Sequence, residues 1–284
     1  MLSYRHAYHA GNQADIFKHF TLFHIVKYLL QKETPVAYLD THAGAGLYRL
    51  DSEASSKTGE AQAGILSLLE AQSKLPPKTD STQSFVGFCK TFLDKTGYYP
   101  GSPAIVASLL RSQDKLILME LHNNEIDILK HNCGPDKRIH IHHRDGFTGL
   151  EALTPPTPRR GLCLIDPSYE LPGDYASTAQ TVLETARRWP AGIMLIWYPV
   201  VGRRENQLKA MHHAICTSGL PVLDICVQSK NAVTEYGLAG SGILVVRPPW
   251  NIHHTLGLGI REILEILGLQ EDTFFSCTRH GRSD

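Results

Sequence analysis

Residues 166–169 read Asp-Pro-Ser-Tyr and directly follow the apolar run 162–165. A buried strand that ends in this way places a carboxylate, a rigid bend and a flat ring at one edge of a sheet. A carboxylate that accepts the hydrogens of an aromatic amine returns electron density to its nitrogen and stabilises the positive charge that builds during attack. We therefore expect Asp166, Pro167 and Tyr169 to form a catalytic loop that activates a poorly nucleophilic exocyclic amine.

For an adenine N6, the Pro167 carbonyl can accept one amino hydrogen while Asp166 accepts the other, and Tyr169 can stack on the flipped base. Stacking is worth about 1–3 kcal/mol, which is comparable with the few kcal/mol that extruding a base costs. A second reading stays open, because an Asp-Pro turn with its tyrosine packed into the core is also a common arrangement.

A loop of small residues follows the first predicted strand. Residues 40–46 read Asp-Thr-His-Ala-Gly-Ala-Gly, and small residues let the backbone approach a ligand closely. The third glycine of a dinucleotide fingerprint is missing, because position 49 is Arg. Glu120 ends the next strand, where its carboxylate can accept both hydroxyls of a ribose. These features favour a sulfonium nucleoside, which has no pyrophosphate, over a dinucleotide.

Asp145 and Gly146 follow the third predicted strand. The carboxylate of Asp145 can accept from an adenine amino group, and Gly146 allows close backbone contact. Each turn alone could be an ordinary strand-to-helix connection. Because ligands in open α/β sheets lie beyond the carboxyl ends of the strands, three such turns together predict a pocket for S-adenosylmethionine.

The runs that read as strands are mostly continuous rather than alternating, which is typical of strands buried on both faces of a mostly parallel sheet. Helical periodicity fills the gaps between them. The sequence therefore predicts a doubly wound α/β fold with a mostly parallel sheet of seven strands. This strand count resembles the Rossmann-like fold of class I S-adenosylmethionine-dependent methyltransferases. The expected strands are 36–39, 116–121, 139–142, 162–165, 193–197, 222–227 and 243–246, and the expected helices are 16–30, 123–131, 175–188, 205–218 and 258–267.

Residues 51–110 interrupt the alternation of strand and helix. Helix-like stretches at 59–71 and 85–95 flank a polar segment, and Pro103 suits the first turn of a further helix with Ser102 as its N-cap. We expect one methyltransferase domain over residues 1–284, with 51–110 as a small helical insertion after the first strand.

The composition has 28 basic and 28 acidic residues and a formal charge of zero, which argues against a protein that coats nucleic acid through bulk charge. No apolar run approaches the length needed to cross a bilayer, and no signal peptide is expected. Six scattered cysteines form no Cys-x-x-Cys pair, so a disulfide framework is disfavoured and a cytoplasmic location is expected.

Fifteen histidines and several arginine pairs carry weaker signals. No cysteine or histidine pairing accompanies the histidines of residues 140–143 at metal-ligand spacing, so we expect no metal site. The pairs at 212–213 and 253–254 are expected on a helix surface and in a loop. Arginine pairs at 159–160, 187–188 and 203–204 could contact phosphates or could equally form solvated surface.

The chain resembles the bacterial family that methylates N6 of one adenine in 23S ribosomal RNA. The resemblance covers roughly residues 1–250, and the order of the motifs and the irregular insertion both agree with it. It is carried by residues 1–6, 9–12, 15, 18–19, 38–46, 99–103, 120–122, 145–147, 166–169, 197–200, 241–242 and 248–250.

This resemblance implies an S-adenosyl-L-methionine cofactor and a monomer that acts on protein-free 23S ribosomal RNA or an early assembly intermediate. It implies an N-terminal flap, residues 1–19, from which Tyr4, His6 and Lys18 face the substrate. The cofactor pocket that it implies consists of His19, His42, Ser102, Glu120, Asp145, Gly146 and Asp166.

One position departs from the family pattern, because Ser168 stands where the family has a second proline. Serine restores a backbone donor and loosens the bend, which affects the rate and the pose of the base. Two alternatives therefore stay open. One is adenine-N6 methylation of DNA, in a protein linked to the use of external DNA, and the other is a non-catalytic nucleic-acid binder on the same fold.

Overall fold

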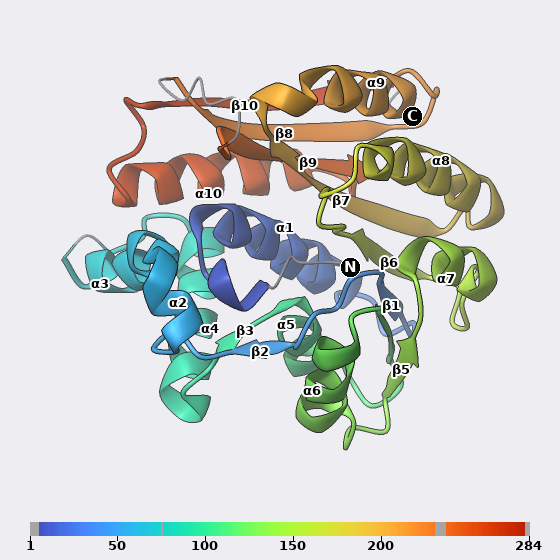
Figure 1. Cartoon of the computed structure of the whole chain (residues 1–284), viewed down its shortest axis with the longest axis horizontal. Helices are drawn as coiled ribbons and strands as arrows, with labels where there is room; N and C mark the ends of the chain where they lie inside the picture. Colours follow the sequence, from blue (N-terminus) through green and yellow to red (C-terminus); the bar gives the residue numbers. More distant parts are fainter. Residues whose placement is uncertain (1–5, 75, 231–236, 282–284) are drawn as a thin grey trace.

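The computed structural model describes residues 6–74, 76–230 and 237–281. In this part of the chain a sheet of eight strands lies between two layers of helices (Figure 1). The strand order is β10-β8-β9-β7-β6-β1-β4-β5. The strands are β1 (Ala37–Asp40), β4 (Lys115–Glu120), β5 (Ile139–His143), β6 (Gly161–Ile165), β7 (Gly192–Val200), β8 (Val222–Ser229), β9 (Gly240–Val246) and β10 (Thr273–His280).

Most of the sheet is parallel. Strands β5, β4, β1, β6 and β7 pair in parallel, and β8 shares their direction because β9 is antiparallel to both β7 and β8. The predicted α/β class is confirmed, and all seven predicted strands are present. The eighth strand, β10, pairs antiparallel with β8 at the edge of the sheet. It escaped prediction because none of its residues is buried, so it lacks an apolar run.

The continuous apolar runs arise because consecutive strand residues face opposite helical layers. In β1, Tyr38 packs with the layer of α1 and α10, whereas Leu39 packs with the layer of α7 and α8. In β6, Leu162 packs with the first of these layers and Cys163 with the second. The first layer includes α1 (Gln13–Leu29), α6 (Asn123–Cys133) and α10 (Ile252–Ile266), and the second consists of α7 (Gly146–Leu153), α8 (Gly173–Arg188) and α9 (Glu205–Cys216).

Several further elements connect β1 to β4. One of them, α4, packs against α10 and α1. Here the structure corrects one prediction, because Gly101 is the N-cap of α5 and Ser102 is its first helical residue. Because Ser102 lies one residue past the cap, its side chain faces the end of β1, where its hydroxyl donates to Asp40 Oδ2 at 2.6 Å. The elements are β2 (Leu47–Tyr48), α2 (Glu53–Thr58), a π-helix (Gln62–Leu66), α3 (Ser67–Lys74), α4 (Asp80–Thr96), β3 (Tyr99–Pro100) and α5 (Ser102–Leu109).

The order of the strands reverses at β1, since β4 and β5 follow on one side and β6 and β7 on the other. Open α/β sheets bind ligands at such a reversal, beyond the carboxyl ends of the strands. The four loops singled out from the sequence all leave the sheet at this edge.

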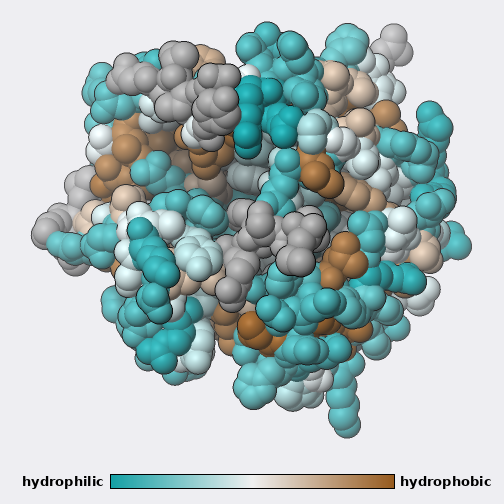
Figure 2. Space-filling view, viewed as in Figure 1, coloured by the Kyte–Doolittle hydropathy of each residue, from teal (hydrophilic) through white to brown (hydrophobic). Residues whose placement is uncertain are grey.

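In Figure 2 most side chains on the visible face are hydrophilic, and hydrophobic ones form scattered spots. Across the described ranges, every helix falls short of the length and apolar character that a bilayer span requires.

Candidate active site

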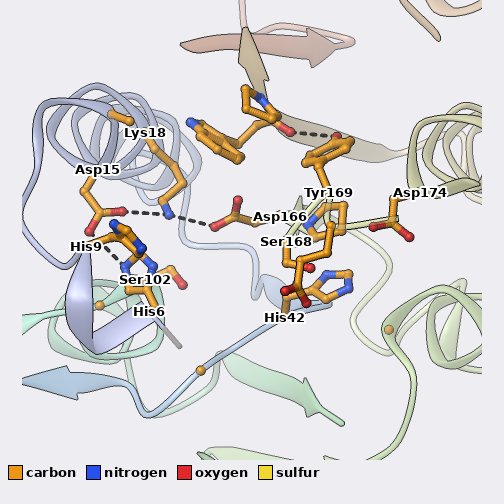
Figure 3. A pocket seen from close by; sticks show the side chains of 18 of the residues that line it. His6, His9, Asp15, Lys18, His42, Ser102, Asp166, Ser168, Tyr169 and Asp174 are labelled. Carbon is orange, nitrogen blue, oxygen red and sulfur yellow. Dashed lines mark hydrogen bonds and ion pairs between the residues drawn. The ribbon is translucent and has the colours of Figure 1, made fainter. Parts of the chain in front are cut away.

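A cavity of about 950 Å³ opens at this edge of the sheet (Figure 3). Its volume lies within the range of small-molecule and cofactor sites. Its wall contains every predicted site residue that the structure describes, and Tyr4 lies outside the described residues. The predicted residues in the wall are His6, Lys18, His19, His42, Ser102, Glu120, Asp145, Gly146, Asp166, Pro167 and Tyr169.

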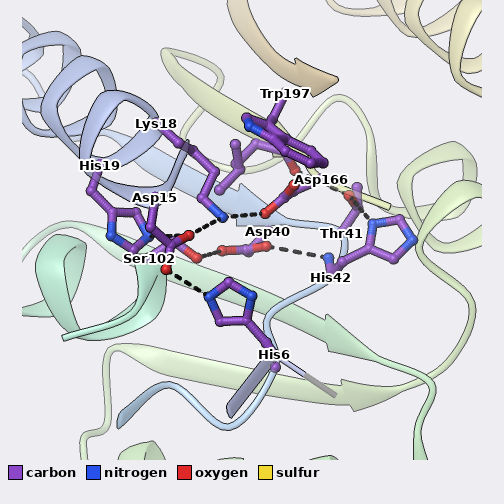
Figure 4. A network of polar contacts seen from close by, with 12 residues as sticks. His6, Asp15, Lys18, His19, Asp40, Thr41, His42, Ser102, Asp166 and Trp197 are labelled. Atoms are coloured by element: carbon purple, nitrogen blue, oxygen red, sulfur yellow. Dashed lines mark hydrogen bonds and ion pairs between the residues drawn. The ribbon is translucent and has the colours of Figure 1, made fainter. Parts of the chain in front are cut away.

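Asp166 directly follows β6, and its carboxylate lies in the cavity with 15% of the side chain exposed. The Nζ of Lys18, from the middle of α1, donates to Asp166 Oδ2 at 2.7 Å. The same ammonium lies 2.8 Å from Asp15 Oδ1 (Figure 4). Lys18 therefore joins two carboxylates and fixes the position of the one that faces the cavity.

Lys18 lines the cavity and lies between the two carboxylates. Its side chain is only 6% exposed, because burial between two carboxylates satisfies its charge inside the protein. His6 Nε2 lies 2.9 Å from the other oxygen of Asp15. Burial alone raises the pKa of Asp15, but the neighbouring His6 and Lys18 outweigh it and hold that pKa well below its usual range.

Asp40, at the end of β1, is a fully buried carboxylate beside this network. It accepts hydrogen bonds from Tyr38 Oη at 2.7 Å, from Ser102 Oγ at 2.6 Å and from the His42 amide at 3.2 Å. Burial raises its pKa to about 6, although the hydrogen bonds from Ser102 and Tyr38 oppose the shift. The sequence interpretation gave Asp40 no role, although its place at a strand end was a usable signal.

Glu120 is fixed at the end of β4 by two backbone amides. Its Oε2 accepts from the Gly44 amide at 2.8 Å, and its Oε1 accepts from the His122 amide at 2.7 Å. Gly44 has a φ of 59°, a left-handed conformation that favours glycine. Because each carboxylate oxygen has a further lone pair, both remain able to accept from a ribose hydroxyl.

Asp145 and Gly146 begin α7. Asp145 is the N-cap of that helix, and its Oδ1 accepts from the Thr148 amide at 2.9 Å. A Cβ on Gly146 would lie 2.1 Å from the carbonyl oxygen of Thr41, so only glycine permits this approach of α7 to the loop after β1.

Of the two predicted histidines of the cofactor pocket, His19 is buried and His42 is half-buried, and both are neutral. Burial lowers the pKa of His42 to about 4 and that of His19 to about 3. His19 Nδ1 lies 2.8 Å from Tyr99 Oη, and His42 Nδ1 lies 2.7 Å from Thr41 Oγ1. Neutral rings add no positive charge to a pocket that is to receive a sulfonium cation.

Tyr169, the predicted stacking residue, lines the cavity and packs against neighbouring rings. Its backbone is left-handed, with a φ of 53°, and this turn folds the ring back onto Tyr175, with ring centroids 4.5 Å apart. Its hydroxyl donates to the Trp197 carbonyl at 2.9 Å, and only 5% of the residue is exposed. Tyr169 is therefore a mostly buried part of the cavity wall.

The cavity also contains residues that the sequence interpretation did not assign to a site. Trp197, from β7, lies beside Asp166, with Lys18 Nζ 5.8 Å from the centre of its ring (Figure 4). Of the three arginine pairs, only that at 203–204 lines the cavity. The sequence analysis included Trp197 only among the residues that carry the family resemblance. It assigned no site role to this residue, because a tryptophan near the end of a buried strand is usually a core residue.

The donor set fits S-adenosylmethionine. Glu120 has lone pairs left for ribose hydroxyls, Asp145 keeps one carboxylate oxygen beyond its helix cap, and Gly146 lets the start of α7 lie against the loop after β1. Asp166 lies in the same cavity, beside Lys18 and Trp197.

Comparisons with known proteins give a consistent result. The chain is 40% identical to "Ribosomal RNA large subunit methyltransferase J" of Escherichia coli (strain K12) over 260 residues, which is 90% of each chain. It is also 40% identical to the protein of the same name from Haemophilus influenzae over 274 residues, covering 94% of this chain and 93% of that one.

A crystal structure of a Legionella pneumophila protein superposes with a TM-score of 0.85 and 29% identity, covering 96% of this chain and 98% of that one. Residues 33–268 match the model of the family described as "Ribosomal RNA large subunit methyltransferase D, RlmJ". With this match and two relatives at 40% identity over nearly their full length, the chain belongs to the RlmJ family of ribosomal RNA large subunit methyltransferases.

Proposed function

We propose that the protein transfers the methyl group of S-adenosylmethionine to N6 of an adenine in 23S ribosomal RNA. The observation that carries this proposal is the Asp166 carboxylate, held by Lys18 at the carboxyl end of β6 in the same cavity as Glu120 and Asp145. Methyltransferase activity follows from family membership, while the target base and the roles of individual residues are the content of the proposal.

The bound cofactor supplies an electrophilic methyl group on a positively charged sulfur. Asp166 Oδ2 is taken by Lys18, so its other oxygen is the one that accepts an amino hydrogen of the adenine. The Pro167 carbonyl accepts the second amino hydrogen. Together these acceptors orient the nitrogen lone pair and stabilise the positive charge that grows on it. The ammonium of Lys18 keeps the carboxylate in place when a base enters.

The cofactor end of the cavity is formed by Glu120 and Asp145, which accept from the ribose and the adenine amino group. His19, His42 and Ser102 form the remaining wall, and Gly146 permits backbone contact. Each of these residues lines the cavity, which supports the assignment.

The substrate enters from the side of the N-terminal segment and residues 203–204. Two arginines at the rim suit the phosphates of a folded RNA, and the indole of Trp197 suits contact with the extruded base. His6 lies at the same opening, and we assign Tyr4 to the same flap. We further propose that the protein acts as a monomer in the cytoplasm and binds deproteinised RNA.

The decisive test is a methyl-acceptor assay with radiolabelled S-adenosylmethionine on deproteinised 23S ribosomal RNA, followed by mass-spectrometric mapping of the modified nucleotide. The expected result is one N6-methyladenosine per RNA molecule. Duplex DNA and single-stranded DNA of matched length serve as competing substrates. Faster transfer to DNA would replace the proposal with the DNA alternative.

Calorimetry with S-adenosylmethionine distinguishes the proposed enzyme from the non-catalytic nucleic-acid binder. We expect binding with a stoichiometry of one. Cofactor binding without transfer to any nucleic acid would indicate a non-catalytic binder, and absence of cofactor binding would refute the assignment of the cavity.

A further inference from the structure

Outside the cavity, three metal-ligating side chains meet near the edge of the sheet that carries β10. His212 and Cys216 are one helical turn apart on α9, and His280 ends β10. One donor atom from each of the three lies within 4.8 Å of the other two. None of these residues lines the active-site cavity.

The strand register brings the third donor to the helix. In the antiparallel pair of β10 and β8, Thr278 lies opposite Asp224 and His280 lies opposite Val222. Residues two apart on a strand share a face, so His280 and Asp224 share the face of Val222. That face packs against Met211 and Ile215 of α9. The fold therefore places His280 beneath the turn that carries His212 and Cys216.

The donor atoms are already oriented toward one another. His212 Nε2 lies 2.9 Å from Asp224 Oδ2 and 3.9 Å from Cys216 Sγ. The ring centroids of His212 and His280 are 5.9 Å apart. The second oxygen of Asp224 accepts from Tyr198 Oη at 2.9 Å, which holds the carboxylate in place as outer-shell partners of metal ligands do.

One atom of the group lacks the partner that a buried polar atom requires. His280 Nε2 is buried, and within the described ranges no group hydrogen-bonds to it. Leaving a buried nitrogen unsatisfied destabilises the folded state. A cation between the three side chains would remove this cost by taking the nitrogen as a ligand.

We propose that His212, Cys216 and His280 bind a single Zn²⁺ ion, with the carboxylate of Asp224 as the fourth ligand. Imidazole and thiolate together select zinc over magnesium or calcium, which prefer oxygen ligands. Binding replaces the hydrogen bond between His212 and Asp224, and the thiol of Cys216 and the imidazole of His212 release their protons to water. Four protein ligands make the site structural, because no position is left for a substrate.

The ion would tie α9 and the edge strand β10 to β8. Cys216 and His280 are 64 residues apart in the sequence. The sequence interpretation expected no metal site. His212 and Cys216 provide two ligands on one helix, but the third ligand comes from a strand that the sequence interpretation did not predict.

The test uses Co²⁺ as a spectroscopic probe of the full-length protein after chelator treatment and removal of the chelator. A thiolate–cobalt charge-transfer band and intense visible bands of tetrahedral cobalt are expected at one equivalent. The Cys216→Ser variant should lose the charge-transfer band. The matched control Cys277→Ser, on β10 and outside the cluster, should keep it.

Zinc affinity is then measured by competition with a chromophoric chelator. The His280→Ala variant is expected to bind Zn²⁺ at least about 10-fold more weakly than the wild type, and His253→Ala should bind as the wild type does. A zinc-dependent rise of Tm in the wild type and its loss in His280→Ala would place the ion on β10.

A wild-type protein without a charge-transfer band, or a band of equal strength in Cys216→Ser, would overturn the proposal. So would equal zinc affinity in the wild type and His280→Ala. Circular dichroism of each variant without metal checks that it folds. If His280→Ala fails to fold, the Cys216→Ser comparison still decides the result.

Discussion

At the scale of single residues, the site depends on one carboxylate and the cation that holds it. Asp166 and Lys18 are 148 residues apart in sequence, yet their charged atoms meet at 2.7 Å. In the proposed reaction, the carboxylate stabilises the developing charge and the ammonium holds the carboxylate in position. Substitutions at these two positions should therefore have different effects on the reaction.

Replacing Asp166 with Asn should reduce the rate of methyl transfer by about 10²–10³-fold, because an amide is neutral and stabilises the developing charge less well. Cofactor affinity by calorimetry should change little, since the ribose and adenine contacts remain. The control Asp127→Asn alters an exposed carboxylate of α6 and should keep full activity. Normal turnover in Asp166→Asn would show that another group activates the amine.

Replacing Lys18 with Met should lower kcat by roughly 100-fold, because a misplaced reacting group costs about that much. The side chain keeps its length but loses the charge that holds both Asp15 and Asp166. Lys27→Met, on the exposed side of the same helix, is the matched control. If Lys18→Met changed only KM for RNA, Lys18 would be a substrate contact rather than a positioning residue.

At the scale of elements, the cofactor end depends on how closely α7 approaches the loop after β1. Gly146 and Gly173 are the first residues of α7 and α8. A Cβ on Gly146 would lie 2.1 Å from the Thr41 carbonyl oxygen, whereas a Cβ on Gly173 would meet nothing within 4 Å. The two glycines therefore form a natural pair for comparison.

The Gly146→Ala substitution should lower the free energy of unfolding by about 1–3 kcal/mol, as overpacking does, and should weaken S-adenosylmethionine binding. Gly173→Ala should leave both quantities nearly unchanged. Urea unfolding and calorimetry provide the measurements. Equal cofactor affinity in the wild type and Gly146→Ala would mean that α7 does not form the cofactor wall.

The contact of α9 with β8 is sensitive to pH in the metal-free protein. The hydrogen bond with Asp224, with a smaller effect of Cys216, raises the pKa of His212 to about 10. The unfolded value is about 6.5, so the folded state binds the proton more tightly. The stabilisation is thus fully present below about pH 6.5 and is lost as the pH rises through about 10.

In a chelator-containing buffer, the wild type should be more stable than His212→Gln at about pH 6, and the difference should shrink toward about pH 10. Urea unfolding at several pH values measures the free energies. The exposed neighbour His213→Gln serves as control and should track the wild type throughout. A difference that is constant with pH would show that the ion pair contributes nothing in the folded state.

At the scale of the whole molecule, the edge strand β10 completes the sheet. It pairs with β8 over eight residue pairs, from Thr273 with Ser229 to His280 with Val222. Without β10, the buried strand β8 would present unpaired backbone groups at an edge. Such edges recruit other chains and lead to aggregation.

A chain that ends at Asp272 should therefore have a lower Tm and should elute as larger species in size-exclusion chromatography with light scattering. A chain that ends at Gly281 keeps β10 and is the control. If the shorter chain eluted as the control does, with an unchanged Tm, β10 would be dispensable for the sheet.

The fold was accessible from the sequence because its strands are buried on both faces. Apolar runs such as 162–165 and 193–197 are continuous for that reason, and each became a strand. The edge strand β10 was missed, since a strand with one solvated face and mixed polarity has no such run. Likewise, Ser102 was given a capping role, although its hydroxyl bonds to Asp40, a residue 62 positions away.

The sequence by itself determined the class of fold and pointed to the strand-end residues of the cavity, because strand ends and small-residue loops are local patterns. Only the tertiary structure decided their contacts. It turned Lys18 toward Asp166, packed the ring of Tyr169 against Tyr175, and brought His280 to Cys216. These contacts join residues far apart in the chain, so they depend on strand order and helix packing, which no local pattern encodes.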